Sequence, residues 1–203
     1  MIPTKSNLML AKNTLHIAKR GYELLDEKKR ILLREMLSLI EWAKDIQDEI
    51  DAAFKEAYSA LQFANITMGV SSVRRISHAA PIERGVELDF RSLMGVELPI
   101  TSLAGDVTKY PYGVYRTNFE LDTAFYNFQQ VKKLIVNLAM VENAAYRLAN
   151  EIKKSKIRGN ALKNTVIPNY EAIIKNIQEV LEEKEREAFT NLKIIKKRKI
   201  DTK

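Results

Sequence analysis

The sequence predicts a mainly α protein: a long antiparallel two-helix coiled coil with a small insert that contains a short β-hairpin. Three observations lead to this fold class. Residues that favour helices dominate a chain with only 7 Gly and 5 Pro among 203 residues. Apolar residues recur at heptad spacing in two long stretches. Between these stretches, residues 65–117 hold five of the seven glycines and three of the five prolines.

The first helical segment is predicted over residues 1–64. Pro3 and Thr4 indicate its start, because proline is tolerated in a first turn. Steps of four and three then give an apolar register that only Lys29 interrupts. Its members are Leu8, Ala11, Leu15, Ala18, Tyr22, Leu25, Lys29, Leu32, Met36, Leu39, Ala43, Ile46, Ile50, Ala53, Ala57, Ala60 and Ala64. Heptads sustained over this length are typical of a coiled coil.

The insert is predicted over residues 65–117, with a short helix and two short strands. The strands are Val86–Phe90 and Val96–Ile100, joined by a turn around residues 92–94. Because the insert connects two helices of one chain, the helices are expected to run antiparallel.

The second helical segment is predicted over residues 118–203. Its heptad register includes Leu121, Ala124, Phe128, Val131, Ile135, Leu138, Ala145, Ala149 and Ile152, with Glu142 as an exception. A weak, basic stretch follows, in which Gly159 and Pro168 disfavour a regular helix and are expected to bend it. The apolar pattern then resumes at Tyr170, Ile173, Ile177, Val180 and Leu181.

Side-chain size suggests how the two helices pair. If Ala64 faces Leu121, small residues of the first helix lie opposite Phe119, Phe125 and Phe128 of the second, which fills the seam without overpacking. The same register brings two basic groups level, with nothing in the chain expected to offset them. We call these residues the basic collar: Lys28, Lys29, Arg30, Lys153, Lys154, Lys156 and Arg158.

The second helix is longer than the first by about 20 residues, or roughly 30 Å of helix. This overhang still carries an apolar stripe, Phe189, Leu192 and Ile195, which we expect another chain to bury. The net charge of +7 also gathers at the ends of the chain. Residues 1–30 (7 basic, 3 acidic) contribute +4, and residues 188–203 (6 basic, 1 acidic) contribute +5.

Other features exclude several functional classes. No cysteine is present, which suits a reducing compartment and rules out disulfides and thiolate metal sites. No apolar run is long enough for a secretion signal or a membrane span. No phosphate-binding glycine motif occurs, and His16 and His78 are too far apart to share a metal. A coiled-coil scaffold or nucleic-acid-binding protein is an alternative, although no aromatic residues interleave with the basic C-terminus.

Four segments together resemble one known family, the D subunits of V-type and archaeal-type rotary ATPases. These are PTKSNLMLAKNTLHIAKRGYELLDEKKRILL from Pro3, MGVELP from Met94, RGNALKNTVIP from Arg158 and LEEKEREAFTNLKIIK from Leu181. Their order across a hairpin makes the likeness specific, and it covers nearly the whole chain.

The resemblance implies a central rotor shaft that couples ATP hydrolysis or synthesis to proton or sodium transport. It implies a non-catalytic chain without cofactor or metal, at the cytoplasmic face of a membrane. The implied partners are the A and B subunits of the ring, the small F subunit and a socket protein above the membrane ring; nucleic acid is not among them.

Within this interpretation, three groups of residues are candidate partner-binding sites. The ring is expected to contact the basic collar and a tip that consists of Leu8, Leu15, Phe189, Leu192 and Ile195. The F subunit and the socket are expected to contact the head, which consists of Val86, Leu88, Phe90, Met94, Val96, Leu98, Tyr112, Tyr115 and Phe119.

Overall fold

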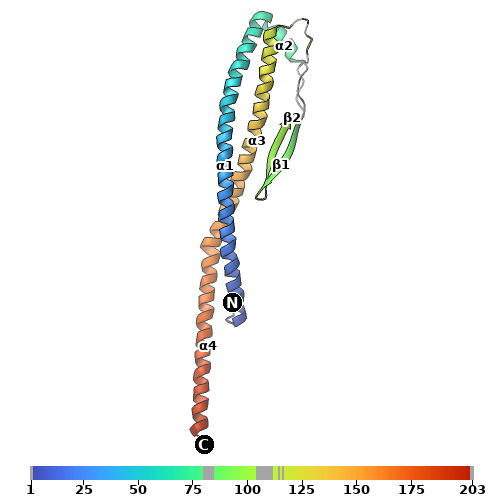
Figure 1. Ribbon diagram of the computed structural model, residues 1–203. Helices are drawn as coiled ribbons and strands as arrows, with labels where there is room; N and C mark the ends of the chain where they lie inside the picture. Colours follow the sequence, from blue (N-terminus) through green and yellow to red (C-terminus); the bar gives the residue numbers. More distant parts are fainter. Residues whose placement is uncertain (1, 80–84, 104–111, 114, 116, 202–203) are drawn as a thin grey trace. The chain divides into compact units, whose positions relative to one another are not determined.

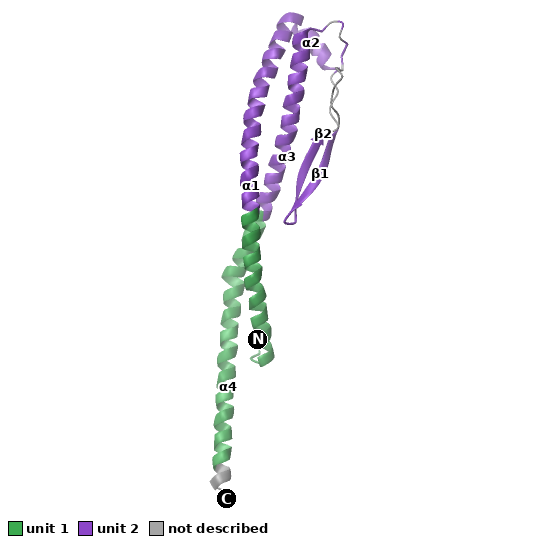
Figure 2. Ribbon diagram, in the orientation of Figure 1, with its two compact units in different colours: residues 1–31, 152–203 green, residues 32–151 purple. Residues whose placement is uncertain are grey.

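A computed structural model describes residues 2–79, 85–103, 112–113, 115 and 117–201 (Figure 1). The elements in chain order are α1 (Lys5–Met68), α2 (Val70–Ser77), β1 (Val86–Leu93), β2 (Val96–Leu103), α3 (Phe119–Ala161), a π-helical turn (Leu162–Val166) and α4 (Ile167–Asp201). The mainly α fold with a small β-hairpin is therefore confirmed. The chain divides into two compact units, residues 1–31 with 152–203 and residues 32–151 (Figure 2). We call them unit 1 and unit 2.

The ends of α1 have clear local causes. The Asn7 N–H donates to Thr4 Oγ1 at 3.2 Å, so Thr4 caps the helix where the sequence indicated a start. At the other end, Gly69 has a φ of +82°, a conformation that glycine adopts without the steric cost of a side chain. The helix therefore runs to Met68, four residues beyond the predicted limit.

In unit 2, α1 and α3 pack antiparallel. Ile46 and Ile50 pack with Val141, while Ala64 packs with Leu121 and with Val73 of α2. The predicted level of Ala64 and Leu121 is confirmed. Phe119 is different, because its side chain is 81% exposed and does not fill the seam.

The predicted register of α3 slips by one residue after Val131. Ile135 and Ala149 are exposed, and the buried positions are instead Val141, Ala144 and Leu148. Glu142 is exposed beside this seam, so it is not a polar interruption of it. A straight helix has 3.6 residues per turn and drifts from a strict heptad, which accounts for a shift of this kind.

In unit 1, the start of α1 packs antiparallel to the chain from α3 to α4. Lys5 pairs with Glu185 at 3.0 Å and Lys19 pairs with Glu171 at 2.7 Å. Between these ion pairs and the collar, a glycine on each side of the seam lies against a larger side chain of the other side. A Cβ atom built on Gly159 would lie 3.9 Å from the ring of Tyr22, and one on Gly21 would lie 3.8 Å from Leu162.

The π-helical turn lies between Gly159 and Pro168. The Ile167 N–H donates to the carbonyl of Leu162, five residues back rather than four. Pro168 has no N–H, so it cannot bond to the carbonyl of Asn164 as a regular α-helix requires. The chain stays helical because Pro168 occupies the first turn of α4. Whether Gly159 and Pro168 bend the helix stays a prediction.

The β-hairpin is longer than predicted. Its strands pair antiparallel from Val86↔Leu103 to Leu93↔Val96, so the turn is Met94–Gly95 rather than residues 92–94. Met94 and Gly95 have φ values of +51° and +79°. Positive φ at both central residues is the requirement of the tight turn whose twist matches that of a hairpin. Glycine satisfies this requirement directly, and methionine adopts it at a steric cost.

Candidate partner-binding surfaces

The basic collar lies within unit 1 and is mostly solvent-exposed. The contact between Gly159 and Tyr22 fixes the antiparallel level, which brings Lys28–Arg30 close to the height of Lys153–Arg158. Lys153, Lys154, Lys156 and Arg158 are all exposed, and no ion pair forms between them and any other residue in the described parts of the chain. Four cations are thus presented on one short helical stretch.

The expectation that nothing offsets the collar is wrong for Lys29 and Arg30. Asp26 Oδ1 pairs with Lys29 Nζ at 2.8 Å, and Asp26 Oδ2 pairs with Arg30 Nη2 at 2.6 Å and Nε at 3.0 Å. Asp26 precedes these residues by three and four positions, so all three lie on one helix face. The uncompensated charge of the collar therefore lies mainly on the α3 side.

The carboxyl of Asp26 is expected to have a pKa below its ordinary value of 3.8. The hydrogen bond from Lys29 lowers this pKa most, and the one from Arg30 comes second. A pKa lowered by folding means that the stabilisation is complete well above pH 3.8 and is lost as the pH falls through the lower folded value. Carboxyl NMR titration measures this. Joint Lys29→Gln and Arg30→Gln substitution is expected to bring the midpoint back towards 3.8. The same midpoint in wild type and double variant contradicts the assignment, and Lys12→Gln serves as a distant control.

The tip of α4 extends beyond α1. Because Lys5 pairs with Glu185, the residues after Glu185 have no facing helix within unit 1. Phe189, Leu192 and Ile195 are 70%, 65% and 56% exposed. Leu8 and Leu15, which the sequence places in the same tip, are half-buried in the seam.

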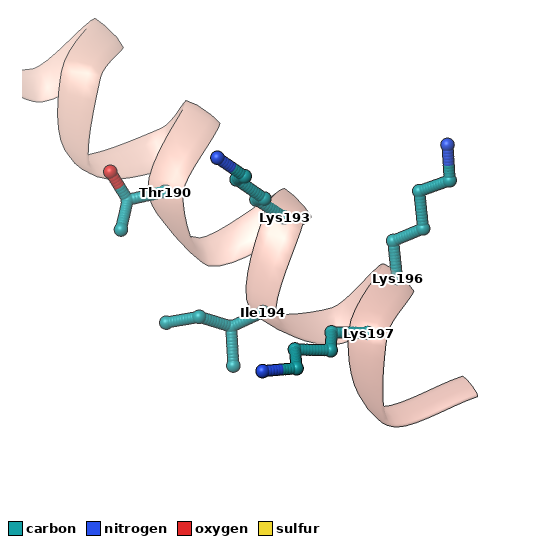
Figure 3. A pocket seen from close by; sticks show the side chains of 5 residues that line it. All are labelled: Thr190, Lys193, Ile194, Lys196 and Lys197. Carbon is teal, nitrogen blue, oxygen red and sulfur yellow. The ribbon is translucent and has the colours of Figure 1, made fainter. Parts of the chain in front are cut away.

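The tip also carries a group of lysines around Ile194, apart from the stripe residues. Figure 3 shows Lys193, Lys196 and Lys197 with Thr190 and Ile194 around a depression on the tip. All five side chains come from one helix, and the lysine chains extend away from it. Among the described residues no second element contributes to the lining, so the depression has the character of a surface for a partner rather than a small-molecule pocket.

The predicted head residues differ in their solvent exposure, and hence in whether a partner can contact them. Val86, Leu88, Phe90 and Met94 are exposed, as are Tyr115 and Phe119. Val96 and Leu98 are buried against the rest of unit 2, and Tyr112 is half-buried, with its hydroxyl bonded to Asp122 at 2.9 Å. Within the predicted head site, the residues of β2 are therefore buried, whereas those of β1 are available to a partner.

Four residues that hold the β-hairpin in place were not predicted from the sequence. Arg147 Nη1 donates to the Glu97 carbonyl of β2 at 3.0 Å, and its guanidinium lies 5.4 Å from the ring centroid of Phe90 in β1. One arginine thus contacts both strands. Arg91 Nη2 reaches Glu35 Oε1 of α1 at 2.8 Å, and Met140 Sδ accepts the Thr101 N–H. These contacts span 39 to 56 residues, and no local pattern indicates them.

A shallow groove between α1 and α3 was also not predicted from the sequence. Its lining includes Phe63, which is exposed, together with Phe119, Glu56 and Glu120. Phe63 precedes the seam residue Ala64, so its position on the heptad predicts exposure.

Two features bear on chemistry. Among the described residues, no group of three or more acidic or histidine side chains is arranged to hold a metal ion. No helix in the same part of the chain is long and apolar enough to cross a bilayer.

Comparison with known proteins gives a consistent result. Residues 7–197 match the family described as the D subunit of ATP synthase. The D subunit of the V-type ATP synthase of Thermotoga neapolitana is 42% identical, over 97% of both chains. The D subunits of the A-type ATP synthases of Methanosphaera stadtmanae and of a Desulfurococcus species are 35% and 34% identical, over 96% of this chain and 92% of theirs.

Proposed function

The chain belongs to the family of ATP synthase D subunits and is a stalk component of a V-type or A-type rotary ATPase, and on this basis we propose how its surfaces are used. The tip and the collar contact the ring of A and B subunits, while the head contacts the F subunit and the socket above the membrane ring. The chain itself catalyses no reaction and binds no nucleotide. It lies at the cytoplasmic face of the membrane and is held there through the complex.

The observation that carries this proposal is the unpaired end of α4. A single helix in water gains nothing from three large exposed apolar side chains. The hydration of Phe189, Leu192 and Ile195 is unfavourable compared with their burial. Inserting this helix into an apolar sleeve buries them. Lys193, Lys196 and Lys197 of the same helix then reach the polar rim of that sleeve, because a long side chain can keep its charge in water.

The collar supports the rotary aspect of the proposal. A rotor passes several similar faces of the ring in turn, so its contacts must be exchanged rather than locked. Exposed ion pairs contribute only about 0.2–1 kcal/mol each, and salt screens them. Lys153, Lys154, Lys156 and Arg158 have this character, because they are exposed and lack ion-pair partners among the described residues.

The seam supports torque transmission. Its apolar residues are buried or half-buried along α1, from Ala11 at the start to Ala64 at the end, so the two helices resist twisting as a pair.

The experiment is a tagged purification of the chain from its native cells, with ATP hydrolysis measured in the eluate and its components identified. Recovery of two large nucleotide-binding subunits and a small partner, with ATPase activity, is the expected result. Recovery of the chain alone, or with nucleic acid and no ATPase activity, contradicts the proposal and favours the scaffold alternative.

A further inference from the structure

The β-hairpin has two outer edges, and only one of them is covered. The edge of β2 lies against α3 (Figure 1). There the Thr101 N–H donates to Met140 Sδ at 3.3 Å, and the Glu97 carbonyl accepts from Arg147 Nη1. Covering an edge with a helix is one way in which proteins prevent unwanted strand pairing.

These two contacts fix which main-chain groups point outward. Thr101 and Glu97 use their main-chain groups away from β1, so the pairs Leu88↔Thr101 and Ser92↔Glu97 do not bond across the hairpin. Pro99 lies midway between them, where its missing N–H removes no bond of the ladder. By the same alternation, Val86, Leu88, Phe90 and Ser92 direct their N–H and carbonyl groups outward from β1.

The edge of β1 is open. Seven of its eight residues are exposed, and only Leu93 is half-buried. Among the described residues, β1 makes no main-chain hydrogen bond outside the hairpin ladder. Such an edge is a template for another strand.

The side chains of β1 specify what kind of strand fits. Val86, Leu88 and Phe90 form an exposed apolar row on one face, and Leu88 is 61% exposed. Glu87 and Asp89 lie on the other face, where no described residue forms an ion pair with either of them. A strand that alternates apolar and basic residues would cover the row and also neutralise both carboxylates.

We propose that β1 is a docking edge that accepts a third strand from a different protein, an extended segment in which apolar residues alternate with lysine or arginine. The added strand bonds to the outward main-chain groups of Val86, Leu88 and Phe90. This inference rests on the proposed function and deepens it, since it names how the head would recognise a partner in the complex.

A second copy of this chain is a poorer occupant. Its β1 would bring two more carboxylates to the same edge. The only cation of the strand, Arg91, is already paired with Glu35 at 2.8 Å. Pairing between copies therefore leaves Glu87 and Asp89 without a free positive charge opposite them.

The first test measures binding of the full chain to a fluorescent seven-residue synthetic peptide in which lysine and valine alternate. In antiparallel addition, the valine N–H groups face β1 and the lysine N–H groups face away. N-methylation of the valines is expected to weaken binding about tenfold or more, because two or three main-chain bonds are lost. The same modification of the lysines leaves binding within about threefold. Equal effects of the two modifications overturn the proposal.

The second test changes the edge itself. Leu88→Pro removes an outward N–H without removing a ladder bond, and Leu88→Ala is its control for the lost side chain. The proline variant is expected to bind the peptide about tenfold more weakly than the alanine variant. Hydrogen exchange at Asp89, whose N–H faces β2, checks that the hairpin remains paired. Equal binding by the two variants, or wild-type dimers that Leu88→Pro abolishes, overturns the proposal.

Assembly separates this inference from the proposed function. Leu88→Pro is expected to recover less of a head partner in the native-cell purification than Leu88→Ala, while the ring subunits are retained. Full recovery of every component with both variants overturns the docking edge and leaves the stalk function standing. A wild-type chain that recovers no ATPase components contradicts the proposed function itself.

Discussion

Leu148→Ala is expected to lower the free energy of unfolding of unit 2 by about 2–5 kcal/mol, and Ile135→Ala by less than about 1 kcal/mol. Leu148 is fully buried in the seam of α3, so its truncation leaves a cavity. Ile135 is 44% exposed and loses little packing on truncation. The two substitutions remove similar side chains from one helix, and only their position in the register differs.

Urea unfolding followed by tryptophan fluorescence measures both effects. Trp42 is the only tryptophan and lies in unit 2, so its signal reports that unit. The strict heptad read from the sequence places Ile135 in the seam and omits Leu148. A larger loss of stability for Ile135→Ala than for Leu148→Ala would therefore restore that register and contradict the structure.

Joint reversal of Lys153, Lys154, Lys156 and Arg158 to glutamate is expected to weaken binding to the ring of A and B subunits about tenfold or more. Each exposed pair contributes only about 0.2–1 kcal/mol, but four lost contacts, each replaced by repulsion, add to a measurable effect. The four side chains are exposed and form ion pairs with no described residue, so we expect their reversal to leave the coiled coil of unit 1 folded.

The measurements are the affinity for purified ring and the ATPase rate of the reconstituted complex. Circular dichroism monitors helix content. Reversal of Lys44, Lys55, Arg74 and Arg75, which are exposed in unit 2, applies the same change of charge away from the collar. The collar assignment fails if both quadruple variants weaken ring binding equally, or if the collar variant binds and turns over as wild type does.

Two features of the candidate site show where sequence reasoning stops. The pairing of Asp26 with Lys29 and Arg30 is local, at spacings of three and four, so the charge pattern of α1 could have indicated it, although we expected nothing to offset the collar. The Arg147 contact with both strands of the hairpin is not predictable in this way. It depends on the position of the hairpin against α3, which no short-range pattern encodes.

Local patterns were enough to predict the two long helices, their antiparallel pairing, the hairpin and the overhanging tip. These follow from periodicity, from glycine and proline positions and from helix length, which are properties of neighbouring residues. Only the structure established the register of α3 beyond Val131, the π-helical turn and which edge of the hairpin is covered. The covered edge is set by packing between distant segments, the register follows the drift of a straight helix from a strict heptad, and the π-helical turn is one altered main-chain bond within a helical stretch. A one-residue slip or an edge contact of this kind changes the burial of many side chains and leaves the local pattern almost the same.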